Sequence, residues 1–154
     1  MVTVCREEKL SVIQFATSNN TLLRRHCIVP ISFKAEEIRN YLAKSLHVSK
    51  SVIELVKEEL VFRVEELIDE SVGIDNGQID SYWLDGIEYV VDWGDEQVSD
   101  FSLVIAGADT TEQEVKKVLG NLYPENDFRV EYFEECWIKR TKRPSKVKQS
   151  LYCV

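Results

Sequence analysis

The chain contains few of the residues that interrupt or cross-link protein structure. Its 154 residues include six glycines, three prolines and four cysteines, and no Gly/Ser-rich or Pro-rich stretch. Long flexible linkers are therefore not expected. The four cysteines lie far apart and form neither a C-x-x-C pair nor zinc-finger spacing. We therefore expect free thiols and a location in the reducing cytoplasm or nucleus.

Motifs for secretion, membrane insertion and common cofactors are also missing. No apolar run approaches the roughly 18 residues of a membrane span. The N-terminus becomes charged at Arg6, before any apolar region of signal-peptide length. No glycine-rich phosphate loop, calcium loop or set of residues with metal-ligand spacing is present in the sequence. We therefore expect no cofactor, no metal and no membrane partner.

Nucleophilic catalysis has little support in the sequence. The chain has two histidines, and one of them, His26, is next to Cys27. Neighbouring residues on a strand point to opposite faces, which argues against a His–Cys dyad and predicts a buried Cys27 beside a solvent-facing His26. An enzyme would need a site assembled from scattered residues, and we keep this as one alternative.

Charge is sorted by segment along the chain. Residues 51–100 hold 15 Asp/Glu against two basic residues, a net of −13, although the whole chain has a net charge of −8. Residues 139–154 hold six Lys/Arg and no acidic residue. An acidic body with a basic C-terminal segment steers charged partners but does not choose a fold.

Apolar periodicity and turn residues predict the secondary structure. Strands are expected over 10–15, 26–33, 79–84, 87–93, 101–106 and 128–138, and helices over 35–46, 51–70 and from 109 to 122. Asp85-Gly86 separates two short apolar runs and predicts a two-residue hairpin turn.

Residues 51–70 are the strongest amphipathic segment. Ser51 and Glu54 form a capping-box pattern at its start. Most of its apolar side chains fall on one side of a helical wheel, opposite six carboxylates. The alternation of Leu60, Phe62 and Val64 instead indicates a strand. We favour the helix because twenty residues without Gly or Pro is long for a strand.

This order of elements predicts an α+β fold with a mainly antiparallel sheet and two to three helices on one side. We expect one globular domain over 1–138 and a basic tail over 139–154. The alternative is an internal repeat at an offset of 77 residues, with five identities over residues 28–59. It divides the chain into two tandem β-β-α-β units, similar in outline to a pair of ubiquitin-like (β-grasp) modules, and it conflicts with a helix over 51–70.

We predict that the chain binds another protein through its acidic face, as an adaptor, inhibitor or immunity-type protein does. The partner would carry a basic patch. An outward Trp83 or Phe133 beside carboxylates would anchor such an interface. The predicted contact residues are Glu58, Glu59, Glu65, Glu66, Asp69, Glu70, Asp92, Asp95, Glu96 and Trp83.

The alternative partner is nucleic acid, bound through the basic segment, which also resembles a nuclear-import signal. The acidic body opposes this, and no aromatic residue interleaves the basic ones as a stacking platform would. Pro30 at a strand edge leaves room for a homodimer through sheet pairing. The residues predicted for nucleic-acid binding or localisation are Lys139, Arg140, Lys142, Arg143, Lys146 and Lys148.

Overall fold

The computed structural model describes residues 5–17, 19–71, 78–94 and 100–141. These residues form an α+β fold, as predicted. The elements in chain order are β1 (Cys5–Ala16), β2 (Leu22–Val29), α1 (Ala35–Leu46), β3 (Ile53–Val64), α2 (Gln78–Tyr82), β4 (Trp83–Asp92), β5 (Phe101–Gly107), α3 (Glu112–Leu122) and β6 (Arg129–Lys139). Short 3-10 turns, Lys50–Val52 and Glu65–Leu67, flank β3.

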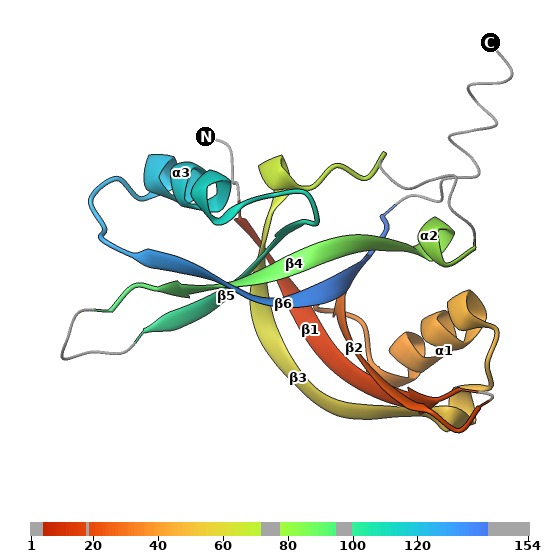
Figure 1. Cartoon of the computed structure of the whole chain (residues 1–154). Coiled ribbons are helices and arrows are strands. Elements are labelled where there is room, and N and C mark those ends of the chain that lie inside the picture. The colour runs from red at the N-terminus through yellow and green to blue at the C-terminus, as the bar shows by residue number, and fades with distance from the viewer. Residues whose placement is uncertain (1–4, 18, 72–77, 95–99, 142–154) are drawn as a thin grey trace, which may run out of the picture.

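The strands close into a barrel in the order β1-β2-β6-β4-β5-β3 (Figure 1). Most neighbouring strands are antiparallel, whereas β2 with β6 and β3 with β5 are parallel and pair only briefly. The sheet is therefore mixed and closed, although most of its strand pairs are antiparallel, in rough agreement with the prediction. Each of the two longer helices packs on the outside of its own part of the barrel, so they do not share one side of an open sheet.

The internal repeat is visible in this architecture. The elements β1, β2, α1 and β3 form one β-β-α-β unit, and β4, β5, α3 and β6 form a second. In each unit the first strand is central and pairs antiparallel with the second and last strands. The two helices begin 77 positions apart, at Ala35 and Glu112. The alternative that divides the chain into two β-β-α-β units therefore describes the order of elements correctly.

Identical residues of the repeat occupy equivalent places in the core. Ile28 and Ile105 are both buried inside the barrel. Leu42 and Leu119 are both buried on the face of a helix that packs against the sheet. The barrel interior contains apolar side chains from all six described strands, namely Leu10, Val12, Ile28, Val61, Leu84, Ile105, Cys136 and Ile138. Apolar burial at matched positions therefore stabilises both units.

The predicted helix over 35–46 is confirmed as α1, and the helix expected after Asp109 is confirmed as α3. Thr111 is the N-cap residue of α3: its Oγ1 accepts a hydrogen bond from the Glu114 N–H at 3.2 Å. The strand predicted over 26–33 is β2, and it ends before Pro30, which has no N–H to donate to a sheet.

The helix predicted over 51–70 is wrong, since these residues form β3 between two short turns. β3 has a bulge at Val56, which has no partner residue on β1. A bulge changes which side chains face the core along a strand, so Ile53 packs with α1 outside the barrel whereas Val61 lies inside it. Two apolar residues of the predicted helical stripe, Val56 and Leu60, are exposed. β6 has the equivalent bulge 77 positions later, at Phe133.

The predicted hairpin turn at Asp85-Gly86 is also wrong, because both residues lie inside β4. Gly86 is required there by packing and not by a turn. A Cβ at this position would lie 2.5 Å from Cδ1 of Ile138 and 3.1 Å from the carbonyl oxygen of Ala106. The barrel interior is therefore filled at the level of Gly86.

This packing gives a pair of opposite expectations for two Gly→Ala substitutions. Gly86→Ala is expected to lower the free energy of unfolding by about 1–3 kcal/mol, because an extra methyl overpacks the core. Gly120→Ala is expected to raise it by about 0.5–1 kcal/mol, because no atom lies within 4 Å of the added Cβ and Gly disfavours a helix. Urea unfolding of both variants checks this, and equal effects would contradict it.

Candidate binding site

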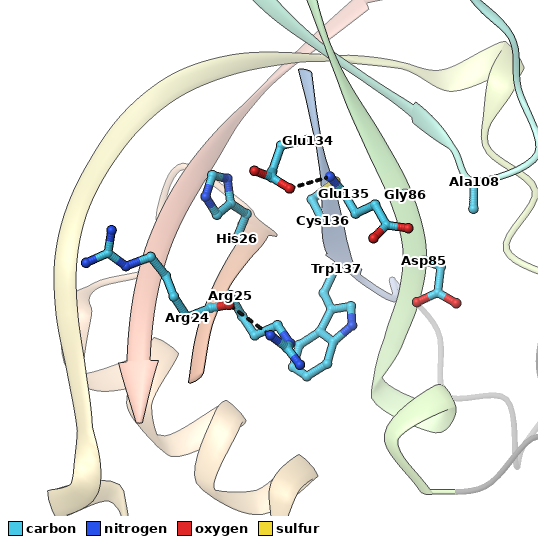
Figure 2. A pocket seen from close by; sticks show the side chains of 10 residues that line it. All are labelled: Arg24, Arg25, His26, Asp85, Gly86, Ala108, Glu134, Glu135, Cys136 and Trp137. Atoms are coloured by element: carbon cyan, nitrogen blue, oxygen red, sulfur yellow. Dashed lines mark hydrogen bonds between the residues drawn. The ribbon is translucent and has the colours of Figure 1, made fainter. Parts of the chain in front are cut away.

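The barrel wall is open between β2 and β6. The two strands pair only at Cys27 with Trp137 and at Ile28 with Ile138. Residues 22–26 of β2 pair with β1, and residues 129–136 of β6, apart from Phe133 at the bulge, pair with β4. A cavity of about 550 Å³ lies over this opening and is lined by residues of β2, β4 and β6 (Figure 2). The volume is in the range of small-molecule sites.

A buried pair of titratable side chains links β2 to β4 inside the opening. Oε2 of Glu88 lies 2.8 Å from Nδ1 of His26, and His26 lines the cavity. Glu88 is 0% exposed. The other carboxyl oxygen, Oε1 of Glu88, is buried and has no hydrogen-bond partner in the described part of the chain. A buried acceptor without a donor is costly, so this oxygen calls for a ligand or solvent.

The protonation of this pair is set mainly by burial. Burial raises the pKa of Glu88 to about 8, with a further increase from the carboxylates of Glu134 and Glu59 and an opposing effect of Lys57. Burial also lowers the pKa of His26, against the effect of Glu134. Near neutral pH, Glu88 is therefore protonated and donates its O–H to the neutral imidazole of His26.

The cavity has one cationic wall and one anionic wall. Arg24 and Arg25 come from β2, whereas Asp85, Glu134 and Glu135 come from β4 and β6. None of these five forms an ion pair with another residue in the described ranges. Arg24 donates to Oε1 of Gln14 at 3.2 Å, but no ion pair neutralises its charge or the other four in the described part of the chain.

On each side of the opening, one backbone group bonds to a nearby side chain. The guanidinium of Arg25 donates to the carbonyl oxygen of Arg24 at 2.9 Å and lies over the ring of Trp137, 5.4 Å from its centroid. On the facing strand, the N–H of Glu135 donates to the side chain of Glu134 at 3.3 Å (Figure 2).

The thiols near this opening are inert. Cys27 and Cys136 are buried free cysteines, and burial raises the pKa of each thiol. Cys27 is buried as predicted. The prediction that His26 faces solvent is wrong, because His26 lines the cavity and contacts Glu88. The arrangement offers no thiolate nucleophile.

The predicted acidic helix face does not exist, because Glu58 and Glu59 lie next to each other on a strand and point to opposite faces. Glu58 pairs with Lys9 at 2.8 Å, and Glu59 with Lys57 at 3.8 Å. Glu66 and Asp69 are exposed in the segment that follows. The other two predicted carboxylates, Glu65 and Glu70, pair with Arg63.

Glu65 and Glu70 surround Arg63 at the end of the barrel where β3 meets β5. The Arg63 side chain is 2% exposed. Its Nη2 donates to Oε2 of Glu70 at 2.8 Å, and its Nη1 donates to Oε1 of the buried Glu8 at 3.4 Å. Burial alone would raise the pKa of Glu70, but hydrogen bonds from Thr141 and Arg63 lower it overall. The carboxylates of Glu65 and Glu70 therefore neutralise a buried arginine of the fold.

Other predicted residues also differ from expectation. Trp83 is 1% exposed, and its Nε1 donates to Ser45 at 2.8 Å, so it offers no surface to a partner. It is buried because α1 packs over it. Asp92 pairs with Arg129 at 2.8 Å. Asp95 and Glu96 lie outside the described residues.

The start of the predicted basic tail belongs to the fold. Lys139 ends β6, and its Nζ lies 4.8 Å from the ring centroid of Tyr41. The side chain of Arg140 is buried and donates to the carbonyl oxygen of Glu70. The other basic residues proposed for nucleic acid or localisation lie outside the described residues: Lys142, Arg143, Lys146 and Lys148.

The exposed segment of β6, residues 131–135, borders the cavity. Tyr132 and Phe133 are 51% and 52% exposed, and Phe133 is outward as the sequence suggested. Glu131, Glu134 and Glu135 are exposed beside them. The bulge at Phe133 leaves this side chain without an opposing residue on β4, which explains its exposure.

Sequence reasoning missed Glu88 and the opening beside it. One signal was available, since Glu88 interrupts the apolar run 87–93, and a carboxyl at a core position of a strand needs a reason. The partner across the opening, His26, could not be inferred because contacts between the two units depend on barrel closure.

Comparison with protein families, curated proteins and solved structures found no match to this chain. No helix in the described ranges has the length and apolar character to cross a membrane. Among the described residues, no group of three or more His, Cys, Asp or Glu side chains is arranged to hold a metal ion.

Proposed function

We propose that this protein is a protein-binding module that contacts a basic partner through the exposed segment of β6. The observation that supports this most is the exposure of two adjacent aromatic side chains, Tyr132 and Phe133, each about half exposed. Large aromatic side chains are the residues that most often anchor interfaces, and exposing two together is costly without a partner.

The carboxylates around these aromatic side chains favour a basic partner. Glu131, Glu134 and Glu135 flank them and form no ion pair with any described residue. Lys or Arg side chains of a partner would pair with these carboxylates and lie over the aromatic rings. The net charge of −8 speeds the encounter with a basic protein.

The backbone of the same segment is suited to an extended partner. In the described part of the chain β6 pairs with β2 only at Trp137 and Ile138, so one edge of residues 131–135 has no strand partner. An extended basic segment would add a strand at this edge, and its alternate side chains would reach the aromatics and carboxylates. The free thiols of Cys27 and Cys136 fit a cytoplasmic or nuclear location.

The test is affinity purification of the full-length chain from the lysate of its source cells, with nuclease present. A basic protein is expected to be retained by the wild type. Phe133→Ala removes the anchor and is expected to weaken binding of that protein roughly 30-fold. Phe101→Ala is the matched control, because Phe101 is 60% exposed on β5, and it is expected to bind as the wild type does.

Two results would contradict the proposal. Equal retention by Phe133→Ala and the wild type would exclude this segment of β6 as the contact surface. Partners that disappear on nuclease treatment would instead favour nucleic acid and the basic C-terminal segment.

A further inference from the structure

We propose that the opening between β2 and β6 is a binding site for a small zwitterion, a molecule that carries a protonated amine and a carboxylate, such as an amino acid. The amine is held by Glu88 and Glu134 and the carboxylate by Arg24 and Arg25. This site borders the same edge of β6 and shares Glu134 with the surface proposed for a protein partner, but its test requires no partner.

The first argument is the unsatisfied oxygen of Glu88. Its side chain is 0% exposed, and it reaches from β4 to His26, a residue that lines the cavity. Oε1 is buried and without a donor from the described residues, and Glu88 is the strand neighbour of Glu134, a second residue that lines the cavity. An N–H group of a ligand supplies the missing hydrogen bond, and a charged N–H supplies a stronger one.

The second argument is the excess of negative charge around that oxygen. Glu134 of β6 and Glu59 of β3 face Glu88, and Lys57 of β3 is the cation that opposes them. The imidazole of His26, on β2, is neutral near neutral pH and adds no positive charge. An ammonium group placed here relieves the repulsion among the carboxyl groups, whereas a ligand anion would increase it.

The third argument is the opposite wall. Arg24 and Arg25 line the same cavity and form no ion pair with a described residue. The contact of Arg25 with Trp137 and with the Arg24 carbonyl fixes its guanidinium at the rim (Figure 2). A guanidinium held in place binds a carboxylate at lower entropic cost. A ligand with both charges therefore uses both walls.

The cavity has room for such a molecule. Its volume of about 550 Å³ exceeds that of a small amino acid, and Gly86, which carries no side chain, is among the lining residues. The Trp137 ring gives one apolar surface. Small-ligand sites typically combine a few fixed polar groups with such a surface.

The experiment is isothermal titration calorimetry of the full-length chain near neutral pH. The probes are the 20 standard amino acids and a series of ω-amino acids of increasing length, each compared with the alkylamine and the alkanoate of the same chain length. At least one amino acid is expected to bind, and both of its singly charged analogues to bind at least about tenfold more weakly.

Variants locate the two charges. Glu88→Gln and Arg25→Gln are each expected to weaken binding of that amino acid at least about tenfold. Glu131→Gln, on the exposed part of β6, and Lys44→Gln, on α1, are the matched controls and are expected to leave affinity unchanged. Glu134→Gln replaces Glu88→Gln as the test if the latter does not give the wild-type circular dichroism spectrum.

Proton release gives an independent readout. Because an ammonium beside Glu88 favours the carboxylate form, binding near neutral pH is expected to release a proton, seen as a heat that varies with the ionisation enthalpy of the buffer. Glu88→Gln abolishes this dependence. Failure of every probe to bind, equal binding of the amine alone, or unchanged affinity in both Gln variants at Glu88 and Glu134 would overturn the proposal.

Discussion

Arg63→Leu is expected to lower the free energy of unfolding by about 3–5 kcal/mol. The Arg63 side chain is 2% exposed and pairs with the buried Glu8 and with Glu70, which itself binds Thr141. Removal of one member of a buried ionic cluster leaves the other charges desolvated and unpaired, and this costs more than the pair contributes. Urea unfolding at neutral pH measures the loss.

Arg129→Leu is the matched control for this substitution. It removes the same functional group from an ion pair with Asp92, but the Arg129 side chain is 80% exposed. Solvent screens such a pair, and only a small change is expected. A loss for Arg63→Leu no larger than that for Arg129→Leu would show that the cluster does not hold this end of the barrel.

Raising the pH from about 6.5 to 8 is expected to destabilise the wild type by about 1.5 kcal/mol, through Glu88. The pKa of Glu88 is about 8 in the folded protein and its ordinary value is 4.5. Between these values the folded state holds a proton that the unfolded state has lost, so stability falls as pH rises. The cost is about 1.4 kcal/mol per pH unit well below pH 8 and falls to about half of that at pH 8, where Glu88 is half ionised in the folded state.

The pH window separates Glu88 from its neighbours. The lowered pKa of His26 acts below about pH 6.5, where the unfolded histidine gains a proton before the folded one. The raised pKa values of Cys27 and Cys136 act above about pH 8, where unfolded thiols ionise. Glu88→Gln is expected to flatten the stability profile between these limits. A profile as steep in Glu88→Gln as in the wild type would contradict the assignment.

The sequence predicted the parts of the fold that depend on local pattern. The helix α1 has its apolar residues at helical spacing and was located correctly, with Ile38 and Leu42 buried. The α+β class follows from the mixture of such helices with short apolar runs. The repeat at 77 residues also predicted the two-unit order, because Ile28 and Ile105 keep the same place in the core.

The failures occur where long-range packing overrides local pattern. The apolar pattern of β3 does not alternate because of its bulge at Val56, and because Ile53 packs under α1 while Val61 lies inside the barrel. The pair Asp85-Gly86 has the sequence of a turn, but glycine is needed at this position because Ile138 fills the space that a side chain would occupy. Neither partner is near in sequence.

The candidate sites show the same limit. Phe133 was identified as an outward aromatic beside carboxylates, and that prediction needed only the sequence of one strand. The His26–Glu88 pair joins positions 62 residues apart and from different units. Its existence depends on closure of the barrel, which no local pattern specifies.

The most direct test of the proposed function is a hydrogen-exchange footprint of the full-length chain with its purified basic partner. The account predicts new protection of the amides of residues 131–135 on β6, because a partner strand would satisfy an edge that now lacks one. The start of β5, residues 101–103, is expected to exchange at an unchanged rate. Protection absent from residues 131–135 and present elsewhere on the chain would contradict the account.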